Sequence, residues 1–475
     1  MLKTIVVMGS IVMGGSNIAS ALTLPEYLAQ VEKQSLSHKS NQARAEGSQL
    51  LAREADLITS PVIFAEAKLS SDGKMNNPPA PSYNDTFTNA YTLGVSQQFD
   101  FGLSAKFAYS LTETEYRGAN FDPGVDDQFW DLSPQVELVM PLWGNGFGRT
   151  VRANEEFTRQ QNLSEQYSAL AQSKNILADA EFTYWRLSTA LEKVTIQEAA
   201  LKAGKNIFGF VNNQNKKNLG ETADVLQARA LTEANELQLQ QAINEREAAK
   251  RAFNLYLNIP ADSDIPQLET VNYADLENTV IPTVRPGDRL DLQAARAQAA
   301  LAKASSDLAL ERNKPKLDLI GGYALNGRGV GAGTAFENAG KTNRDAGYVG
   351  VMFQMPLNFQ ATSDAKAGAL RLKDSAEINV QNISYTQEQD WLTLKEKLNE
   401  SVMTLKLART MENAQKSKLE NERTRLRQGR TTTYQVLLFE QDYTSAQAAR
   451  VQAIRDIIAL QTQVKLYETA PVGGK

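Results

Sequence analysis

Met140-Pro141-Leu142 and its second copy, Met355-Pro356-Leu357, mark the points where strand-like sequence gives way to helix-like sequence. A run of alternating apolar residues precedes each copy, and a long stretch without proline follows it. Both stretches are rich in Ala, Leu, Gln, Glu, Lys and Arg, a composition that favours long helices. The chain is therefore predicted to alternate between strand-bearing segments and long helical segments.

The proline-free stretches carry apolar residues three or four positions apart, which is helical spacing. In the first stretch the stripe consists of Leu239, Ala242, Ala249, Phe253 and Tyr256, with Arg246 at the turn between them. In the second it consists of Ala446, Ala449, Ala453, Ile457, Leu460 and Val464. Such narrow stripes on long helices favour coiled-coil packing. Helices of a soluble bundle produce the same local pattern.

A glycine with polar neighbours interrupts each helical stretch once. The first break is Asn218-Leu219-Gly220, and the second is Arg427-Gln428-Gly429. Glycine is favoured just past the end of a helix, and the Asp or Thr residues that follow both breaks can cap the next helix. Each stretch therefore predicts an αα-hairpin, with Gly220 and Gly429 at the two turns.

Segments with period-two alternation precede both hairpins, at 103–111, 135–140, 317–323 and 348–355. This alternation is typical of a transmembrane β-barrel with a polar interior, and half-buried strands of soluble proteins show it as well. An additional strand pair, 91–99 and 103–112, turns at Asp100-Phe101-Gly102 and either widens the barrel or folds as a cap. Long polar loops are expected over 70–89 and 326–341.

These pieces recur in the same order, which indicates an internal repeat. A helix leading through a proline into a strand occurs at 41–64 and again at 292–319, and a helical hairpin follows each set of strands. We therefore predict a first structural repeat over residues 22–270 and a second over 271–475. One chain offers too few strands to close a wide barrel, so oligomerisation is expected.

The N-terminus has the pattern of a secretory signal peptide over residues 1–21. Lys3 precedes an apolar run, and Ala19-Ser20-Ala21 ends a segment of small residues. The composition contains few of the side chains that enzymes commonly use in catalysis, because the chain has no cysteine and one histidine, His38. A formal net charge of −5 also argues against nucleic-acid binding, which normally uses a basic excess.

Two motifs could be interpreted as a nucleotide-binding loop and a catalytic carboxylate pair, and both have simpler explanations. Residues 335–342 end in Gly340-Lys341-Thr342 and approach a phosphate-binding loop, but Ala335 stands where its first glycine belongs. The segment also lies in a loop leading to a strand, whereas a working loop leads into a helix. Glu155-Glu156 is interpreted as a solvated helix face, because no partner converges on it. The chain is predicted not to be an enzyme.

At this point the sequence resembles the TolC-type outer membrane efflux proteins (outer membrane factors), over essentially the whole mature chain. The resemblance rests on the order and spacing of several short segments across the two repeats. They are Leu22-Thr23-Leu24-Pro25-Glu26, Pro141-Leu142-Trp143 with Gly146-Phe147-Gly148-Arg149, Gly220 with Asp224-Val225-Leu226-Gln227-Ala228, Arg289-Leu290-Asp291-Leu292 with Asn313-Lys314-Pro315-Lys316-Leu317, and Gly429 with Val436-Leu437.

The resemblance implies an α+β membrane protein: a trimeric channel with a shared transmembrane β-barrel and a long periplasmic α-helical barrel built from two internal repeats. It implies an exit duct of a tripartite efflux or type I secretion system, which conducts substrates passively and has no catalytic residue, cofactor or metal. The implied location is the outer membrane, with the helical barrel in the periplasm. The implied partners are two further copies in a homotrimer, a periplasmic adaptor (membrane fusion) protein, an inner-membrane transporter and outer-membrane lipid. Drugs, metals, peptides and whole proteins all leave through such conduits.

The resemblance also implies a periplasmic entrance at the hairpin turns. Leu219, Gly220, Gln428 and Gly429 form the implied tip that docks the adaptor. Relatives often carry aspartates after the second glycine, which form an acidic ring. Here Gln435 and Leu438 stand at those positions, whereas Asp224 keeps the family position in the first repeat. Asp224 is therefore the candidate ring residue, and capping of the returning helix is the alternative role.

A structural coiled-coil protein, such as an exported surface filament subunit, is the rival hypothesis. It accounts for the long helices and for the missing cysteines. It gives no reason for alternating strands between the helices or for the repeated Met-Pro-Leu transition.

Overall fold

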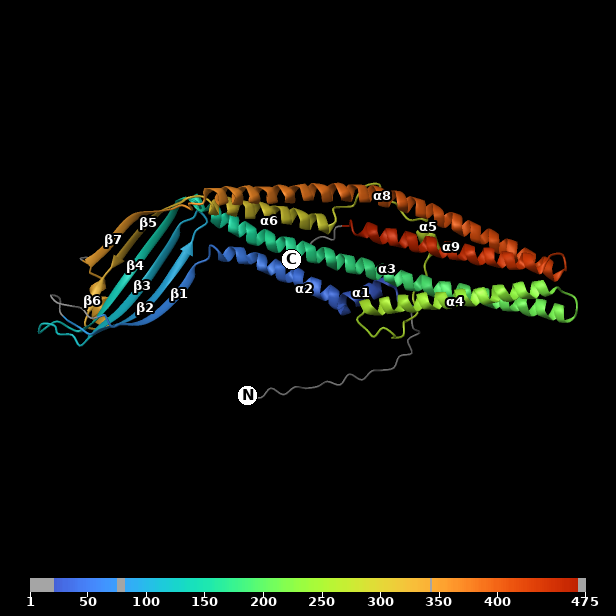
Figure 1. Ribbon diagram of the computed structural model, residues 1–475, viewed down its shortest axis with the longest axis horizontal. Coiled ribbons are helices and arrows are strands. Elements are labelled where there is room, and N and C mark those ends of the chain that lie inside the picture. The colour runs from blue at the N-terminus through green and yellow to red at the C-terminus, as the bar shows by residue number, and fades with distance from the viewer. Residues whose placement is uncertain (1–20, 75–81, 342–343, 469–475) are drawn as a thin grey trace, which may run out of the picture. The chain divides into compact units, whose positions relative to one another are not determined.

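The computed structural model describes residues 21–74, 82–341 and 344–468 (Figure 1). The α-helices are α1 (Leu24–Gln34), α2 (Leu36–Leu51), α3 (Arg149–Lys216), α4 (Thr222–Tyr256), α5 (Tyr273–Glu277), α6 (Leu290–Arg312), α7 (Ala332–Ala339), α8 (Phe359–Arg427) and α9 (Thr433–Lys465). The strands are β1 (Val62–Asp72), β2 (Asp85–Gln98), β3 (Ser104–Arg117), β4 (Gln128–Trp143), β5 (Lys316–Leu325), β6 (Gly327–Gly329) and β7 (Asp345–Gln354). Apart from Ala21, the predicted signal peptide lies outside the described residues and stays a prediction.

The chain divides into two compact units, each built from both halves of the sequence. The helical unit contains the described residues up to 43, then 169–289 and 386–468. The sheet unit contains 44–168 and 290–385 within the described ranges. The long helices α3 and α8 contribute residues to both units.

Both proline-free stretches fold as the predicted αα-hairpins. Helix α3 has 68 residues and returns as α4 with 35, and helix α8 has 69 residues and returns as α9 with 33. At 1.5 Å of rise per residue, α3 and α8 each extend for roughly 100 Å. No proline interrupts their hydrogen-bond ladders, which is why such lengths are possible.

The helical unit has a core at which helix α1 meets the hairpin of α3 and α4. The rings of Tyr27 and Phe253 stack with centroids 4.3 Å apart, and the Tyr184 ring lies 5.5 Å from Tyr27. Helix α1 begins at a capping box between Thr23 and Glu26, where the Thr23 N–H donates to Glu26 Oε2 at 2.9 Å. The predicted apolar stripe of α4 is confirmed here, because Ala242, Ala249 and Phe253 are buried.

The strands form one antiparallel sheet in the order β1-β2-β3-β4-β5-β7, and β6 pairs with β4 beside this path. The predicted extra pair is β2 and β3, which are hydrogen-bonded to each other and lie inside the sheet (Figure 1). The cap alternative is therefore wrong for this hairpin. Gly102 turns the hairpin with φ of +97°, and an added Cβ would meet the Gly148 nitrogen at 2.6 Å.

The two faces of the sheet differ sharply in chemistry. Cross-strand partners share a face, so the register assigns each side chain to one side. The first side, which we name the apolar face, consists largely of exposed apolar residues: Ile63, Leu69, Tyr91, Leu93, Val95, Phe107, Tyr109, Val136, Leu138, Leu319, Tyr323, Val349, Val351 and Phe353. The opposite, polar face carries Glu66, Lys68, Thr88, Thr92, Lys106, Ser110, Gln135, Glu137 and Asp318, together with a smaller number of exposed apolar side chains, namely Val62, Tyr348 and Met352.

The segments expected to be long loops contain more regular structure than their composition suggested. Strand β1 continues to Asp72 and β2 begins at Asp85, so regular structure takes up both ends of the segment 70–89. In the segment 326–341, β6 pairs with β4, and α7 packs against Leu132 through Ala335 and Ala339. Helix α7 therefore covers part of the apolar face at β4.

The arrangement around α7 removes the phosphate-binding interpretation. Ala335 and Ala339 lie in the helix and are buried, and Gly340 and Lys341 follow its C-terminal end. Thr342 lies outside the described residues. The C-terminus of a helix carries partial negative charge, so it repels phosphate rather than binding it.

Of the helices in the described part of the chain, none combines the length and apolar character needed to cross a membrane.

Candidate functional site

The two hairpin turns of the helical unit end their first helices with the same backbone motif. In the turn from α3 to α4, the Leu219 N–H donates to the Gln214 carbonyl at 2.9 Å, and the Asn218 N–H donates to the Asn215 carbonyl at 2.9 Å. In the turn from α8 to α9, the N–H of Arg430 donates to the carbonyl of Arg425 at 2.9 Å. These bonds define a Schellman motif, which requires a left-handed residue at its C′ position.

The left-handed residue is Asn218 in the first turn and Gly429 in the second. Asn218 has φ of +60° and Gly429 has φ of +68°. The prediction is therefore confirmed for Gly429, but Gly220 is not the left-handed residue of its turn. A Cβ added at Gly220 would make only ordinary contacts, the nearest at 3.4 Å. Sequence reasoning missed Asn218 because it looked for glycine, although asparagine also tolerates this conformation.

The returning helices begin at equivalent positions but with different caps. Glu221 is the N-cap of α4 and makes no capping side-chain bond, whereas the Thr432 hydroxyl accepts from the Gln435 N–H at 3.3 Å at the start of α9. Each N-cap follows its left-handed residue by three positions. Counted from the left-handed residue, Gln435 is therefore the position of the second turn that is equivalent to Asp224 in the first.

An apolar cluster joins the two turns, which are far apart in the sequence. Val211 of α3, Ala228 of α4 and Leu437 of α9 are buried together, and Ile207, Phe208, Val225 and Leu231 pack around them. Figure 1 shows both turns at the same end of the helical unit. The predicted tip residues Leu219, Gly220, Gln428 and Gly429 therefore belong to one region, and the Leu219 side chain is 72% exposed there.

Asp224 lies in the first turn of α4 and is half-buried. Within the described part of the chain it makes no side-chain hydrogen bond or ion pair. An acid in this position is favourable for the helix start in any case. Gln435 is half-buried as well, and Leu438 is exposed.

A buried carboxylate fixes the shape of the second turn. Glu422 of α8 is buried, and Arg425 Nη1 donates to its Oε2 at 3.0 Å, while the Thr431 hydroxyl donates to its Oε1. Arg423 also donates to Glu440 of α9, with Nε to Oε1 at 2.8 Å. The turn is thus held by charge-assisted bonds as well as by its backbone.

The two hairpins are also joined through a buried arginine farther from the turns. Arg450 of α9 is only 8% exposed, and it donates to Glu192 of α3 at 2.7 Å and to Glu412 of α8. Its guanidinium lies 4.9 Å from the centre of the Tyr273 ring. Burial alone would lower the pKa of Arg450, but the hydrogen bond and charge of Glu192, together with the charge of Glu412, raise it above the ordinary value.

The buried side of α9 differs from the predicted apolar stripe at one position. Ala446, Ala453 and Ile457 are buried as predicted, but Ala449 is exposed and Arg450 occupies the buried position. Position 450 continues the spacing of three and four between Ala446 and Ile457, so the pattern itself contained the signal. The predicted stripe omits Arg450, because charged residues are rarely buried unless they are paired.

A second ionic cluster joins α3, α4 and α9. Lys193 Nζ of α3 lies 2.6 Å from Glu245 of α4, and Arg455 Nη1 of α9 lies 2.7 Å from the same carboxylate. Burial alone would raise the pKa of Glu245, but the bond and charge of Lys193 and the charge of Arg455 lower it overall. Glu245 is therefore the shared acceptor of two cations from two other helices.

Neither a metal centre nor a histidine-based site is present in the part of the chain that the structure describes. No group of three or more His, Cys, Asp or Glu side chains there is able to hold a metal ion. His38 is buried, and its Nδ1 lies 2.9 Å from the Ser173 hydroxyl. Its hydrogen bond and burial fit a structural role.

Comparison with known proteins finds the same fold in outer membrane channels. The outer membrane protein VceC of Vibrio cholerae superimposes with a TM-score of 0.64 and 16% identity, over 94% of this chain and 96% of that one. The open state of the MtrE outer membrane channel of Neisseria gonorrhoeae gives 0.63 and 16%, over 94% and 88%. The CmeC outer membrane channel of Campylobacter jejuni gives 0.63 and 15%, over 94% and 85%.

No family model matches the sequence, and no curated protein matches it. The structural neighbours nevertheless agree along nearly the whole chain, so the chain has the fold of the TolC-type outer membrane channels. The predicted resemblance to this fold is confirmed, whereas the trimer and its shared barrels stay predictions.

Proposed function

We propose that this protein is the outer-membrane exit duct of a tripartite efflux or type I secretion system. Three copies would share one transmembrane β-barrel and one periplasmic α-helical barrel, through which substrates pass without catalysis. The observation that carries the proposal is the exposed apolar face of the sheet, which needs a cover that a single copy does not provide. Lipid is the natural cover for an outward-facing apolar band above a polar interior.

The edges of the sheet support closure by identical copies. Strands β1 and β7 are the two ends of the six-strand path, so each leaves one edge without a strand partner in the described chain. Every neighbouring pair in the path is antiparallel, so β1 and β7 run in opposite directions. β7 of one copy can therefore pair antiparallel with β1 of the next, with apolar faces on the same side.

Three such copies would close a barrel of eighteen strands, six from each copy. With strands about 4.8 Å apart and tilted by about 40°, the backbone diameter is about 36 Å. Without β2 and β3 each copy would contribute four strands, and the same calculation for the resulting twelve strands gives a diameter of about 24 Å. The inserted hairpin of β2 and β3 would therefore widen the membrane pore, which suits bulky cargo.

The helical turns would form the periplasmic entrance and dock the adaptor. This part of the proposal is supported by the apolar cluster that brings the two turns together and by the exposed Leu219. The two repeats, 22–270 and 271–475, belong to the same proposal. They are supported by the matching Schellman motifs, which place Asn218 and Gly429 in equivalent positions.

Cysteine crosslinking between copies tests the assembly directly, because the natural chain has no cysteine. Ala65→Cys in β1, combined in turn with Val349→Cys or Val351→Cys in β7, should yield covalent dimers and trimers in outer-membrane fractions. The matched control is Ala65→Cys with Tyr323→Cys, on the same face but one strand away from the edge. A soluble monomer, or crosslinks only in the control, would refute the proposal. A filament subunit, the rival hypothesis, would give crosslinked ladders longer than three.

A further inference from the structure

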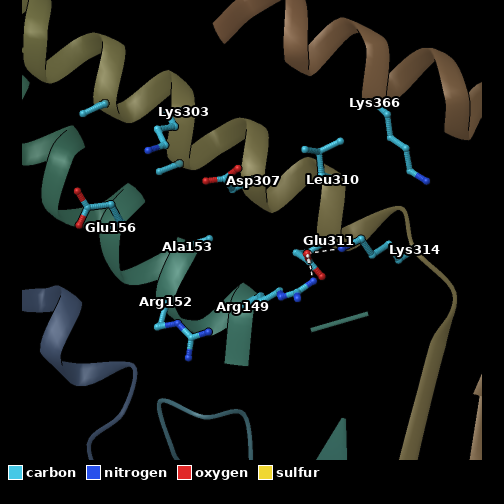
Figure 2. A pocket seen from close by; sticks show the side chains of 12 residues that line it. Arg149, Arg152, Ala153, Glu156, Lys303, Asp307, Leu310, Glu311, Lys314 and Lys366 are labelled. Atoms are coloured by element: carbon cyan, nitrogen blue, oxygen red, sulfur yellow. Dashed lines mark hydrogen bonds and ion pairs between the residues drawn. The ribbon is translucent and has the colours of Figure 1, made fainter. Parts of the chain in front are cut away.

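The sheet unit contains a charged pocket that the exit duct does not require. It lies between the start of α3, the end of α6 and the start of α8, and has a volume of about 670 Å³ (Figure 2). Five cationic side chains line it: Arg149, Arg152, Lys303, Lys314 and Lys366. Three carboxylates also line it, from Glu156, Asp307 and Glu311. The lining thus carries both signs, with an excess of positive charge.

A buried carboxylate in the pocket has unused hydrogen-bonding capacity. Glu311 is 8% exposed, and its Oε1 receives Lys314 and lies 3.7 Å from Arg149 Nη1, as Figure 2 shows. Its Oε2 is buried and has no donor among the described residues. An acceptor left in this state is costly, so a donor supplied by a ligand would be favourable there.

Several charged groups of the lining have no partner of their own in the described chain. Lys303, Asp307 and Lys366 make no hydrogen bond or ion pair with any residue that the structure describes. Lys303 and Asp307 are one helical turn apart on α6, and both are exposed. Unpaired cations and an unpaired acid, side by side in one pocket, match a ligand that carries an anionic and a cationic group.

The pocket lies just beyond the strand ends of the apolar face. Trp143 pairs with Leu317, and Leu317 pairs with Phe353, so these three form the last row of that face. The chain runs from Trp143 to Arg149 and from Lys314 to Leu317 within a few residues. Helix α8 starts at Phe359, and Lys366 follows two turns later, about 10 Å along the helix. Under the proposed function this row marks the edge of the apolar band, which is where the polar headgroup layer of a bilayer begins.

We propose that the pocket binds the headgroup of a phospholipid from the periplasmic leaflet, of the phosphoethanolamine class. The phosphate would meet Arg149, Lys303 and Lys366, because guanidinium and ammonium groups recognise phosphate by charge-assisted bonds. The ammonium would meet Asp307 and the free Oε2 of Glu311. Membrane placement rests on the proposed function, whereas the charge pattern of the pocket does not.

The experiment measures lipid retained by the full-length protein. The purified trimer is delipidated, exposed to equal amounts of phosphatidylethanolamine and phosphatidylglycerol, and examined by native mass spectrometry. We expect phosphatidylethanolamine to be retained in preference. The double variant Lys303→Gln/Lys366→Gln should bind both lipids at least about tenfold more weakly, because it removes two of the three cations that would meet the phosphate.

Two further variants separate the roles. Asp307→Asn should reduce the preference for phosphatidylethanolamine while leaving phosphatidylglycerol binding unchanged. The matched control is Lys373→Gln, one heptad beyond Lys366 on α8 and outside the pocket lining, which should behave as the natural protein. Equal lipid retention in the natural trimer and in the double variant would overturn the proposal.

A competition arm distinguishes a lipid from a free headgroup. Soluble glycerophosphoethanolamine at the lipid concentration should displace little phosphatidylethanolamine, because the acyl chains add apolar contacts beside the Trp143 row. Complete displacement would show that the pocket takes the free headgroup, and it would overturn the lipid assignment. Loss of the trimer or of membrane extraction in the natural protein would contradict the proposed function instead.

Discussion

Gly429 should be the most sensitive residue at the helical turns, and Gly220 should be tolerant. Gly429 has φ of +68°, and an added Cβ would meet no atom within 4 Å. The cost of Gly429→Ala is therefore backbone strain alone, about 1–2 kcal/mol for an L-residue in the left-handed region. Gly220 has no positive φ, so Gly220→Ala should cost close to nothing.

Hydrogen exchange at the turns measures this cost locally, because exposed turns open without unfolding the whole molecule. A strain of 1–2 kcal/mol should speed exchange of the 424–432 amides by roughly 5- to 30-fold in Gly429→Ala. Gly220→Ala should leave exchange at 214–222 unchanged. Asn218→Gly should slow exchange there, because glycine adopts the left-handed conformation without the asparagine penalty.

The same variants connect the turn to function. Under the proposed function, Gly429→Val should lower export while the trimer remains intact, because its β-branched side chain adds strain at the entrance. Gly220→Ala should export normally. Equal losses of export and equal changes in exchange for both glycines would refute the assignment of the left-handed position to Gly429 and Asn218.

Three other changes test the ionic groups of the helical unit. Arg450→Met should destabilise the protein by about 3 kcal/mol in urea unfolding, because the half-buried carboxylates of Glu192 and Glu412 lose their shared cation and Glu192 keeps only the Tyr273 hydroxyl. Arg229→Met, in an exposed pair, should change the stability by less than about 0.5 kcal/mol. The folded-state pKa of Glu245 is lowered, so its contribution is present above its unfolded pKa of about 4.3 and is lost as pH falls through the folded value. Glu245→Gln should therefore flatten the fall in stability below about pH 4, and parallel pH curves would contradict this. Asp224→Asn should reduce cation preference in planar bilayers, whereas Gln435→Glu should increase it; unchanged selectivity in both variants would leave Asp224 with a capping role.

The positions of the strands could be predicted from the sequence, but their partners in the sheet could not. Alternation in 103–111 and 348–355 identified strands, because the two faces of a strand repeat every second residue. The pairing of β4 with β5 joins residues nearly two hundred positions apart, and no local pattern encodes such a partner. The register was needed to show that most of the exposed apolar residues of six strands lie on one face.

The sequence by itself determined the long helices, their two breaks and the repeated order of elements, because proline placement, helix-favouring composition and period-two alternation act locally. Only the tertiary structure decided that Asn218 rather than Gly220 takes the left-handed position, since the hydrogen bonds of the helix end choose between neighbouring residues. It also decided that Arg450 is buried, because Glu192 and Glu412 come from other helices. The charged pocket has the same origin: four of its five cations lie on three separate helices, Lys314 follows α6, and only folding brings them together.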